Sequence, residues 1–241
     1  MTAGIQERLL RIQERMAAAC ARAGRSADSA RLLAVSKTHP PETIREAFEC
    51  GVRAFGESRV QEARAKIPNC PSGISWHLVG HLQRNKVKPV VEMFDVIHSV
   101  DSLRLLETVD RASAEAGRRL DVLLEVNVSG ESAKFGLSPD AIPDLLEGAN
   151  SLMNVNVVGL MTMPPFAEDV EKARPHFRRL RELRDAWRGK TGFALDELSM
   201  GMTHDFEVAI EEGATWVRIG TALFGERAKK EVGNGEIHEE N

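Results

Sequence analysis

Short runs of apolar residues alternate with amphipathic stretches along most of the chain. The apolar runs are nearly continuous, which is typical of strands buried on both faces of a parallel sheet. We therefore expect eight buried strands, near Leu32–Ser36, Ala54–Glu57, Trp76–Gly80, Val96–Ser99, Val122–Val128, Val157–Thr162, Glu197–Met200 and Val217–Thr221.

The stretches between these runs have the apolar spacing of helices. Pro41 starts one of them and Gly51 follows its end, as helix boundaries favour. We expect Asp101 to be an N-cap, and Thr203–Glu207 has the composition of a helix N-terminus. We expect helices at Ile5–Ala23, Pro41–Cys50, Ser58–Lys66, Asn85–Glu92, Ser102–Ala116, Ser138–Asn150, Glu168–Arg188, Asp205–Glu212 and Glu226–Glu231.

Eight strand–helix units match the count of an α/β (β/α)8 TIM barrel with an extra N-terminal helix. A doubly wound open sheet is the alternative, because one false strand would change the closure. No Pro/Gly/Ser-rich linker divides the chain, so we expect a single domain over residues 1–241. Its core would run from about 32 to 225, and the polar residues 232–241 are expected to fray.

Composition narrows the class of protein. A net charge of −4 without a basic tract gives little support for nucleic-acid binding. No segment approaches the roughly 20 apolar residues needed to cross a bilayer, and charged residues interrupt the N-terminus, so we expect neither a membrane span nor a signal peptide. Cys20, Cys50 and Cys70 have no metal-type spacing and fit a reducing cytoplasm.

In a barrel, the active face lies where the strands end. Lys37 follows the first apolar run, with only Ser36 between them, and stands just before a helix start. Lysine in water is a poor nucleophile, but a partly desolvated lysine at a pocket mouth can form an imine with a carbonyl cofactor. The alternative is a lysine that simply reaches into water.

The ends of the last two strands form an anion-site candidate. Gly201 and Gly220 would allow backbone N–H groups to approach a phosphate, and Ser199 and Thr221 would add hydroxyl donors. Barrels often bind phosphate at these two strand ends. Alternatively, both glycines only turn the chain.

Three other polar groups need a partner or a role. Arg218 is embedded in an apolar run, and a buried arginine must be paired, with a ligand's ring nitrogen or with a carboxylate such as Glu125 or Glu57. His77 and His81 flank one strand end, but nothing nearby completes a metal site.

Several segments, in order from about residue 32 to 225, together resemble the pyridoxal-phosphate-binding homeostasis proteins, a family with an alanine-racemase-like barrel. The matching segments are Ala34–Thr38 (AVSKT), Phe55–Glu57 (FGE), Trp76–Lys86 (WHLVGHLQRNK), Asn127–Gly136 (NVSGESAKFG), Gly159–Met163 (GLMTM), Leu198–Met202 (LSMGM) with Asp205 and Phe206, Val217–Thr221 (VRIGT), and Phe224 with Gly225.

The resemblance implies that pyridoxal 5'-phosphate (PLP) forms an imine with Lys37. It implies that Ser199–Gly201, which includes Met200, and Gly220–Thr221 hold the phosphate, and that Arg218 faces the pyridine nitrogen. One departure is visible, because Ser58 stands where the family usually has asparagine.

Two further residues are candidates for the cofactor site. His77 is one. Lys134 is the other, either as a second contact for PLP or as a nucleophile in its transfer, although its loop reads equally well as solvated.

The chain contains no tyrosine. Alanine racemases with this barrel use a tyrosine from an added domain as a second acid/base, and the chain ends soon after its eighth strand. The resemblance therefore implies a monomeric PLP carrier that buffers the aldehyde and hands it to apo-enzymes. The alternatives are an amino-acid racemase or lyase that uses Lys37 with His77 or His204, and a metabolite-binding regulator without an imine.

Overall fold

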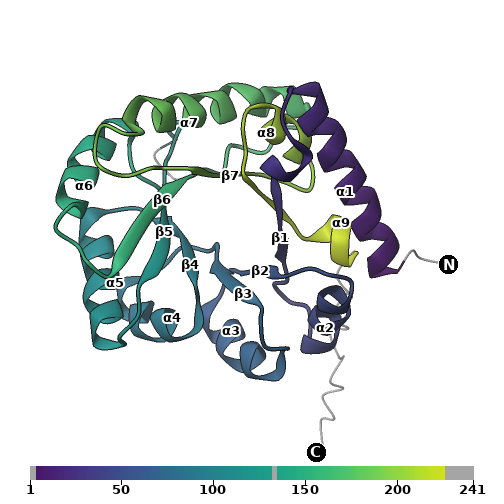
Figure 1. The fold of residues 1–241 in the computed structure, drawn as a ribbon, viewed down its shortest axis with the longest axis horizontal. Coiled ribbons are helices and arrows are strands. Elements are labelled where there is room, and N and C mark those ends of the chain that lie inside the picture. Colours follow the sequence, from purple (N-terminus) through teal and green to yellow (C-terminus); the bar gives the residue numbers. More distant parts are fainter. Residues whose placement is uncertain (1–3, 132–134, 226–241) are drawn as a thin grey trace, which may run out of the picture.

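Eight parallel strands form a closed barrel in this computed structural model, which describes residues 4–131 and 135–225 (Figure 1). The strands are β1 (Arg31–Val35), β2 (Ala54–Glu57), β3 (Ser75–Leu78), β4 (Val96–Val100), β5 (Leu120–Glu125), β6 (Val155–Met161), β7 (Glu197–Met202) and β8 (Trp216–Ile219). β1 pairs with β8, with Ala34 opposite Ile219, which closes the sheet. This pairing confirms the barrel and rules out the open sheet.

Helices surround the barrel on its outside (Figure 1). They are α1 (Ile5–Arg22), α2 (Pro41–Glu49), α3 (Val60–Lys66), α4 (Val87–Met93), α5 (Leu103–Glu115), α6 (Ile142–Ala149), α7 (Arg174–Trp187), α8 (Phe206–Glu211) and α9 (Thr221–Phe224). Short 3-10 turns lie at Ala27–Ser29, Ile67–Asn69, Arg84–Lys86, Pro139–Ala141 and Val170–Ala173. The extra N-terminal helix α1 packs against α8 and α9. The helix expected at Glu226–Glu231 and the tail 232–241 lie outside the described residues.

Two expected boundaries are wrong in ways that bear on function. The eighth strand ends at Ile219, and Thr221 begins the short helix α9 after Gly220. The cap of α5 is Ser102, whose hydroxyl accepts from the Leu105 N–H, whereas Asp101 lies one residue outside the helix and accepts from Ser102.

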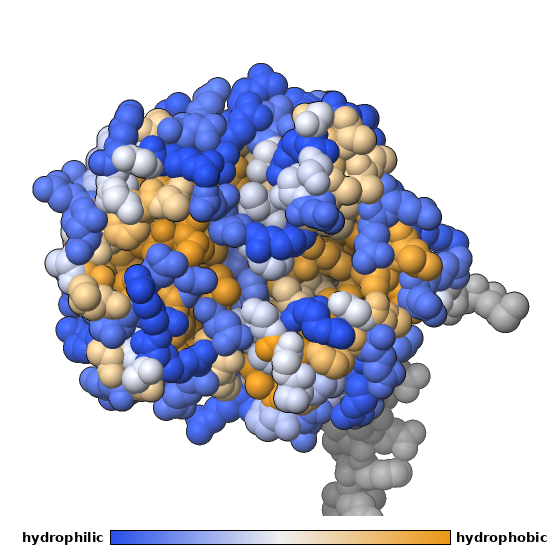
Figure 2. Space-filling model, viewed as in Figure 1, coloured by the Kyte–Doolittle hydropathy of each residue, from blue (hydrophilic) through white to orange (hydrophobic). Residues whose placement is uncertain are grey.

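The main apolar core lies between the barrel and its helices. Phe55, Phe94, Phe177 and Phe206 are fully buried there. On the face seen in Figure 2, polar residues form the outer rim and hydrophobic residues gather towards the middle. Within the described ranges, no helix has the length and apolarity needed to cross a membrane. The three cysteines are free thiols.

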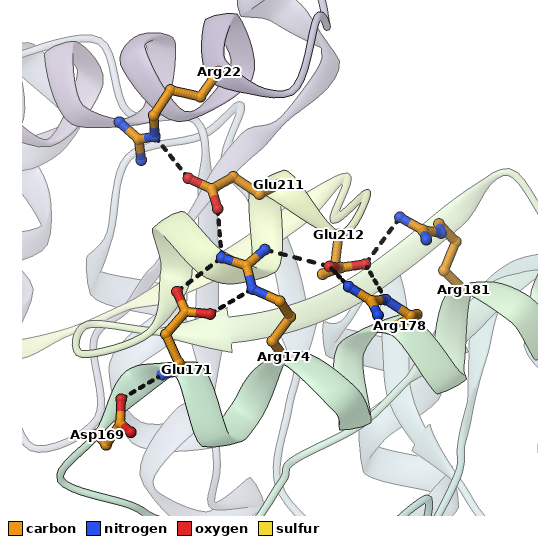
Figure 3. A network of polar contacts seen from close by, with 8 residues as sticks. All are labelled: Arg22, Asp169, Glu171, Arg174, Arg178, Arg181, Glu211 and Glu212. Carbon is orange, nitrogen blue, oxygen red and sulfur yellow. Dashed lines mark hydrogen bonds and ion pairs between the residues drawn. The ribbon is translucent and has the colours of Figure 1, made fainter.

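An ion-pair network joins α1, α7 and α8 (Figure 3). Arg174 at the start of α7 contacts Glu171, Glu211 and Glu212. Glu211 also binds Arg22 of α1, with 2.7 Å between Nε and Oε1. The Glu212 side chain is 5% exposed and additionally contacts two further arginines of α7, Arg178 and Arg181. The network therefore fastens the N-terminal helix to the last part of the barrel.

Glu212→Gln should lower the free energy of unfolding by about 2 kcal/mol at pH 7, because charge-assisted hydrogen bonds to its arginines are lost. Burial alone would raise the pKa of Glu212, but hydrogen bonds from Arg178 and Arg174 outweigh it and leave the pKa lowered. The stabilisation is thus complete above the unfolded pKa of about 4.3 and is lost as the pH falls through the lower folded-state pKa. Urea titrations across this pH range measure the difference between the two proteins.

The matched control is Glu182→Gln on α7, the helix that carries the arginines bound by Glu212. Glu182 forms an exposed pair with Arg179 at 3.9 Å, and such pairs contribute little. Equal destabilisation by the two substitutions would contradict a structural role for the Glu212 network.

Candidate functional site

A cavity of about 300 Å³ opens at the carboxyl ends of the strands, with Lys37 in its wall. We call it the Lys37 cavity. Its lining residues come from the ends of β1, β2, β3, β7 and β8 and from the segments that follow β6 and β7: Val35, Lys37, Ser58, Val79, Met163, Phe166, Met202, Thr203, His204, Arg218, Gly220 and Thr221. The Lys37 side chain is exposed in this cavity.

The structure brings together only part of the expected site. Lys37, Arg218, Gly220 and Thr221 line the Lys37 cavity, and so does Ser58. The other expected residues that the structure describes, Ser199, Met200, Gly201 and His77, are buried and do not line it. Lys134 lies outside the described residues.

Strand β7 continues to Met202, two residues past its expected end at Met200, so Gly201 lies within the strand and not in a phosphate-binding turn. Ser199 pairs with Trp216 and Met202 pairs with Arg218, so β7 has one extra residue between these two points, which forms a bulge. Gly201 occupies it with φ of 88°. A Cβ at Gly201 would lie 2.5 Å from the Cβ of Ala209, so glycine is required there for packing against α8.

Met200 consequently points away from the cavity. It is fully buried in the apolar core between the barrel and its helices. The bulge instead delivers Met202 to the cavity wall. The side chain of Met200 is therefore not a cofactor contact.

Gly220 and Thr221 lie where β8 passes into α9. A Cβ at Gly220 would come within 3.1 Å of the Val35 carbonyl oxygen, so glycine lets β8 run close beside the Lys37 strand. The first N–H groups of a helix have no acceptor within the helix and can bind an anion. The start of α9, with the Thr221 hydroxyl, therefore presents donors to the Lys37 cavity.

The Arg218 guanidinium reaches across the barrel interior and is only 4% exposed. Its Nη1 donates to the carbonyl and hydroxyl oxygens of Ser199 at 2.8 and 2.7 Å, and its Nη2 donates to the Thr162 carbonyl at 2.9 Å. Neither expected carboxylate partner forms an ion pair with it within the described part of the chain. Burial lowers the pKa of Arg218 to about 10, against the opposing fields of Asp205 and Glu125, so it stays cationic at neutral pH.

A hydrogen-bonded chain continues from Ser199 towards the opposite end of the barrel. The Ser199 hydroxyl lies 2.9 Å from His98 Nδ1, and His98 Nε2 lies 2.9 Å from His77 Nδ1. His77 Nε2 in turn lies 3.1 Å from the Ser75 hydroxyl. Burial lowers the pKa of His77 to about 3 and that of His98 well below its ordinary value, so both rings are neutral.

This position excludes His77 as a base for a ligand in the Lys37 cavity. His204 does line the cavity, and its Nε2 lies 3.1 Å from the Glu168 carbonyl oxygen. A metal site is not indicated either, because the described residues contain no cluster of three or more possible ligands.

A second polar cluster, on the outer side of the barrel wall, holds the backbone around Lys37. The Lys66 ammonium is 2.7 Å from Glu57, 2.7 Å from Glu62 and 2.9 Å from the Ser36 carbonyl oxygen. The Ser36 hydroxyl donates to Glu57 at 2.6 Å, and the Thr38 N–H donates to Glu62. Both neighbours of Lys37 are therefore anchored, and Thr38 is held at a positive φ of 70°.

Sequence reasoning did not name Phe166 as a site residue. Phe166 lines the Lys37 cavity beside Met163, Met202 and Thr203, but nothing in the loop sequence around it marks it. Phe166 is 80% exposed, which a sequence cannot reveal.

Comparison with known proteins identifies the family. The model of the alanine racemase N-terminal domain matches residues 8–228. The chain belongs to this family. It is 50% identical over 222 residues to the pyridoxal phosphate homeostasis protein of Aquifex aeolicus (strain VF5), covering 92% of this chain and 97% of the relative.

Two solved structures of this alanine-racemase-like barrel are similar over nearly their whole length. PipY of Synechococcus elongatus PCC7942 with PLP bound has a TM-score of 0.77 and 38% identity, covering 92% of this chain and 100% of PipY. A protein described as unknown from Bifidobacterium adolescentis has a TM-score of 0.84 and 39% identity, covering 91% and 94%.

Lys66→Met should lower the free energy of unfolding by about 3 kcal/mol, because removing one partner leaves a buried carboxylate uncompensated. Burial raises the pKa of Glu57, while its hydrogen bonds with Lys66 and Ser36 oppose that shift. The double substitution Glu57→Gln with Lys66→Met should cost less than Lys66→Met alone, since it removes the stranded charge. Urea-induced unfolding measures all three.

Lys88→Met is the control, because Lys88 pairs with Glu115 on the surface with 75% of its side chain exposed. We expect an unchanged urea midpoint for it. If the Lys66 and Lys88 variants unfolded at the same urea concentration, the buried cluster would not be the anchor described above.

Proposed function

We propose that this protein binds PLP as an imine on Lys37 and takes part in PLP homeostasis, holding the cofactor and handing it on. One observation carries the proposal. Lys37, Arg218 and the start of α9 meet around a single cavity, in a chain that is 38% identical to PipY, whose structure has PLP bound.

The residues around the Lys37 cavity fit such a cofactor. At about 300 Å³ the cavity is at the lower end of the range for small-molecule sites. Lys37 supplies the amine, and the start of α9 with Thr221 supplies donors for a phosphate. Arg218 supplies a fixed cation whose position is set by Ser199 and the Thr162 carbonyl.

PLP supplies an aldehyde that combines reversibly with amines and a ring that can accept electrons. The protein's part is to orient these groups. Arg218 remains charged and can only donate hydrogen bonds. An Arg218 that faces the pyridine nitrogen would therefore disfavour protonation of the ring. An unprotonated ring is a weaker electron sink, which favours holding the cofactor over catalysis.

Acid–base chemistry at this site has few candidates. The chain has no tyrosine, and His77 is neutral and buried below Arg218. His204 is the histidine in the Lys37 cavity. A PLP-dependent racemase or lyase using Lys37 and His204 is therefore the second candidate function. We further propose a monomer in the cytoplasm that meets apo-enzymes transiently.

Lys37→Arg should abolish the covalent adduct with PLP, because arginine keeps the charge but does not form an imine under these conditions. The measurement incubates the protein with PLP, reduces it with borohydride and maps the modified peptide by mass spectrometry. The imine absorbance before reduction gives the extent of loading. We expect full modification of wild type at Lys37 and none of the variant.

Lys88→Arg is the matched control, since Lys88 is a surface lysine of α4 remote from the cavity lining. It should load like wild type. An adduct on Lys37→Arg at the wild-type level, or a wild-type adduct mapped to other lysines, would refute the assignment of Lys37.

A steady-state screen of amino acids separates the carrier from the enzyme. The PLP-loaded protein should racemise or cleave amino acids no faster than free PLP does. Turnover well above free PLP that is lost in both Lys37→Ala and His204→Gln would establish the enzyme instead.

A further inference from the structure

A second pocket adjoins the Lys37 cavity at the ends of β5 and β6. It also has a volume of about 300 Å³, and we call it the Glu125 pocket. Its lining residues are Glu125, Val126, Asn127, Phe135, Met163, Pro164 and Met202. Met163 and Met202 line both spaces, so the two share a wall made of flexible apolar side chains.

Glu125 is the only ionisable group among these lining residues, and it is 6% exposed. Its pKa is raised to about 7 by burial and by the charge of Asp101, against the opposing effect of Arg218. Across residues 4–131 and 135–225, no side chain or N–H group hydrogen-bonds its carboxylate. A mostly buried carboxylate without a protein donor is costly unless water or a ligand in the pocket supplies one.

The chemistry of the pocket limits what would occupy it. A carboxylate in a poorly solvated site calls for a cationic hydrogen-bond donor, which would also stabilise its ionised form. The remaining walls are mostly apolar, and Phe135, Met163 and Met202 at the rim are 59%, 43% and 40% exposed. An ammonium group on a short apolar stem satisfies both requirements, whereas an anion would be repelled by the ionised carboxylate.

We propose that the Glu125 pocket is a second subsite that binds a primary amine, with the ammonium on Glu125 and the stem against Met163 and Met202. This proposal depends on the proposed PLP-binding function. It adds primary amines as a second class of ligand. A primary amine is the group that can exchange with a lysine imine, and the Glu125 pocket shares Met163 and Met202 with the wall of the Lys37 cavity. The Glu125 pocket is thus placed to admit the amine that takes the cofactor over.

The test follows the methionine methyl groups by NMR in protein free of PLP. The full chain carries ¹³C-methyl methionine, and Met163→Leu and Met202→Leu assign the two signals. Titration with n-butylammonium should shift both methyl signals saturably. Glu125→Gln should weaken this binding about tenfold or more, because the charge-assisted hydrogen bond is lost.

Two controls make the result specific. n-Butanol, of equal length but uncharged, should bind wild type at least about tenfold more weakly. Glu168→Gln removes an exposed carboxylate on the segment after β6 and should bind n-butylammonium like wild type. The unchanged methyl signal of the buried Met200 verifies that each variant is folded.

The two possible sources of the amine are a free amino compound and a lysine side chain of another protein. Titration with Nα-acetyl-lysine N-methylamide distinguishes them, since its backbone groups must fit outside the Glu125 pocket. Binding of n-butylammonium alone assigns the subsite to small amines, and binding of both extends it to protein lysines.

Equal binding of n-butanol and n-butylammonium by wild type, or no saturable shift of either methyl signal, would overturn the proposal even if Glu125→Gln failed to fold. PLP loading is measured separately on the same wild-type protein. Loss of loading would defeat the proposed function, whereas normal loading with no amine binding would defeat only the Glu125 subsite.

Discussion

A guanidinium buried inside the barrel is the constraint on which the site depends. Arg218 cannot lose its charge at neutral pH, and no carboxylate among the described residues pairs with it, so oxygen atoms of neighbouring strands must solvate it. These oxygens belong to Ser199 on β7 and to Thr162 after β6. The carboxyl ends of β6, β7 and β8 are therefore held in one arrangement, and the Lys37 cavity forms above them.

The barrel wall divides the residues around Lys37 into two sets. Lys37 lines the cavity on one side, while Ser36 and Glu57 join Lys66 in a buried cluster on the other. Successive side chains of an extended segment point to opposite faces. The short segment around Lys37 therefore presents the lysine to the cavity and its neighbours to the buried cluster. The Lys37 amine can stay exposed because the backbone around it is held by neighbouring side chains that face away from the cavity.

Much of the fold could be predicted because strand number and position depend on local apolar runs. The location of Lys37 followed from the same pattern, since strand ends of a parallel barrel share one face. The bulge in β7 was not predictable, because Gly201 reads equally well as a phosphate loop or as a packing requirement. Its actual reason, contact with Ala209 of α8, is a tertiary one.

The partners of buried polar groups were the least predictable. Glu125 was a candidate partner for Arg218, yet it faces its own pocket, and none of the described residues donates a hydrogen bond to its carboxylate. Ser199 was expected to bind phosphate directly, but its hydroxyl serves Arg218 and His98. β4 and β7 are not neighbours in the barrel, so contacts between them arise only when the barrel closes, which no local pattern encodes.

The hydrogen bonds beneath Arg218 all donate in the same direction, away from the arginine. Arginine only donates, so the Ser199 oxygen accepts, and its own buried hydrogen must go to His98 Nδ1. His98 then carries its proton on Nε2 and donates to His77 Nδ1, and His77 carries its proton on Nε2 and donates to Ser75. One fixed charge therefore selects the tautomers of two histidines and aligns their dipoles, so that the interior of the barrel is electrically polarised from one end to the other.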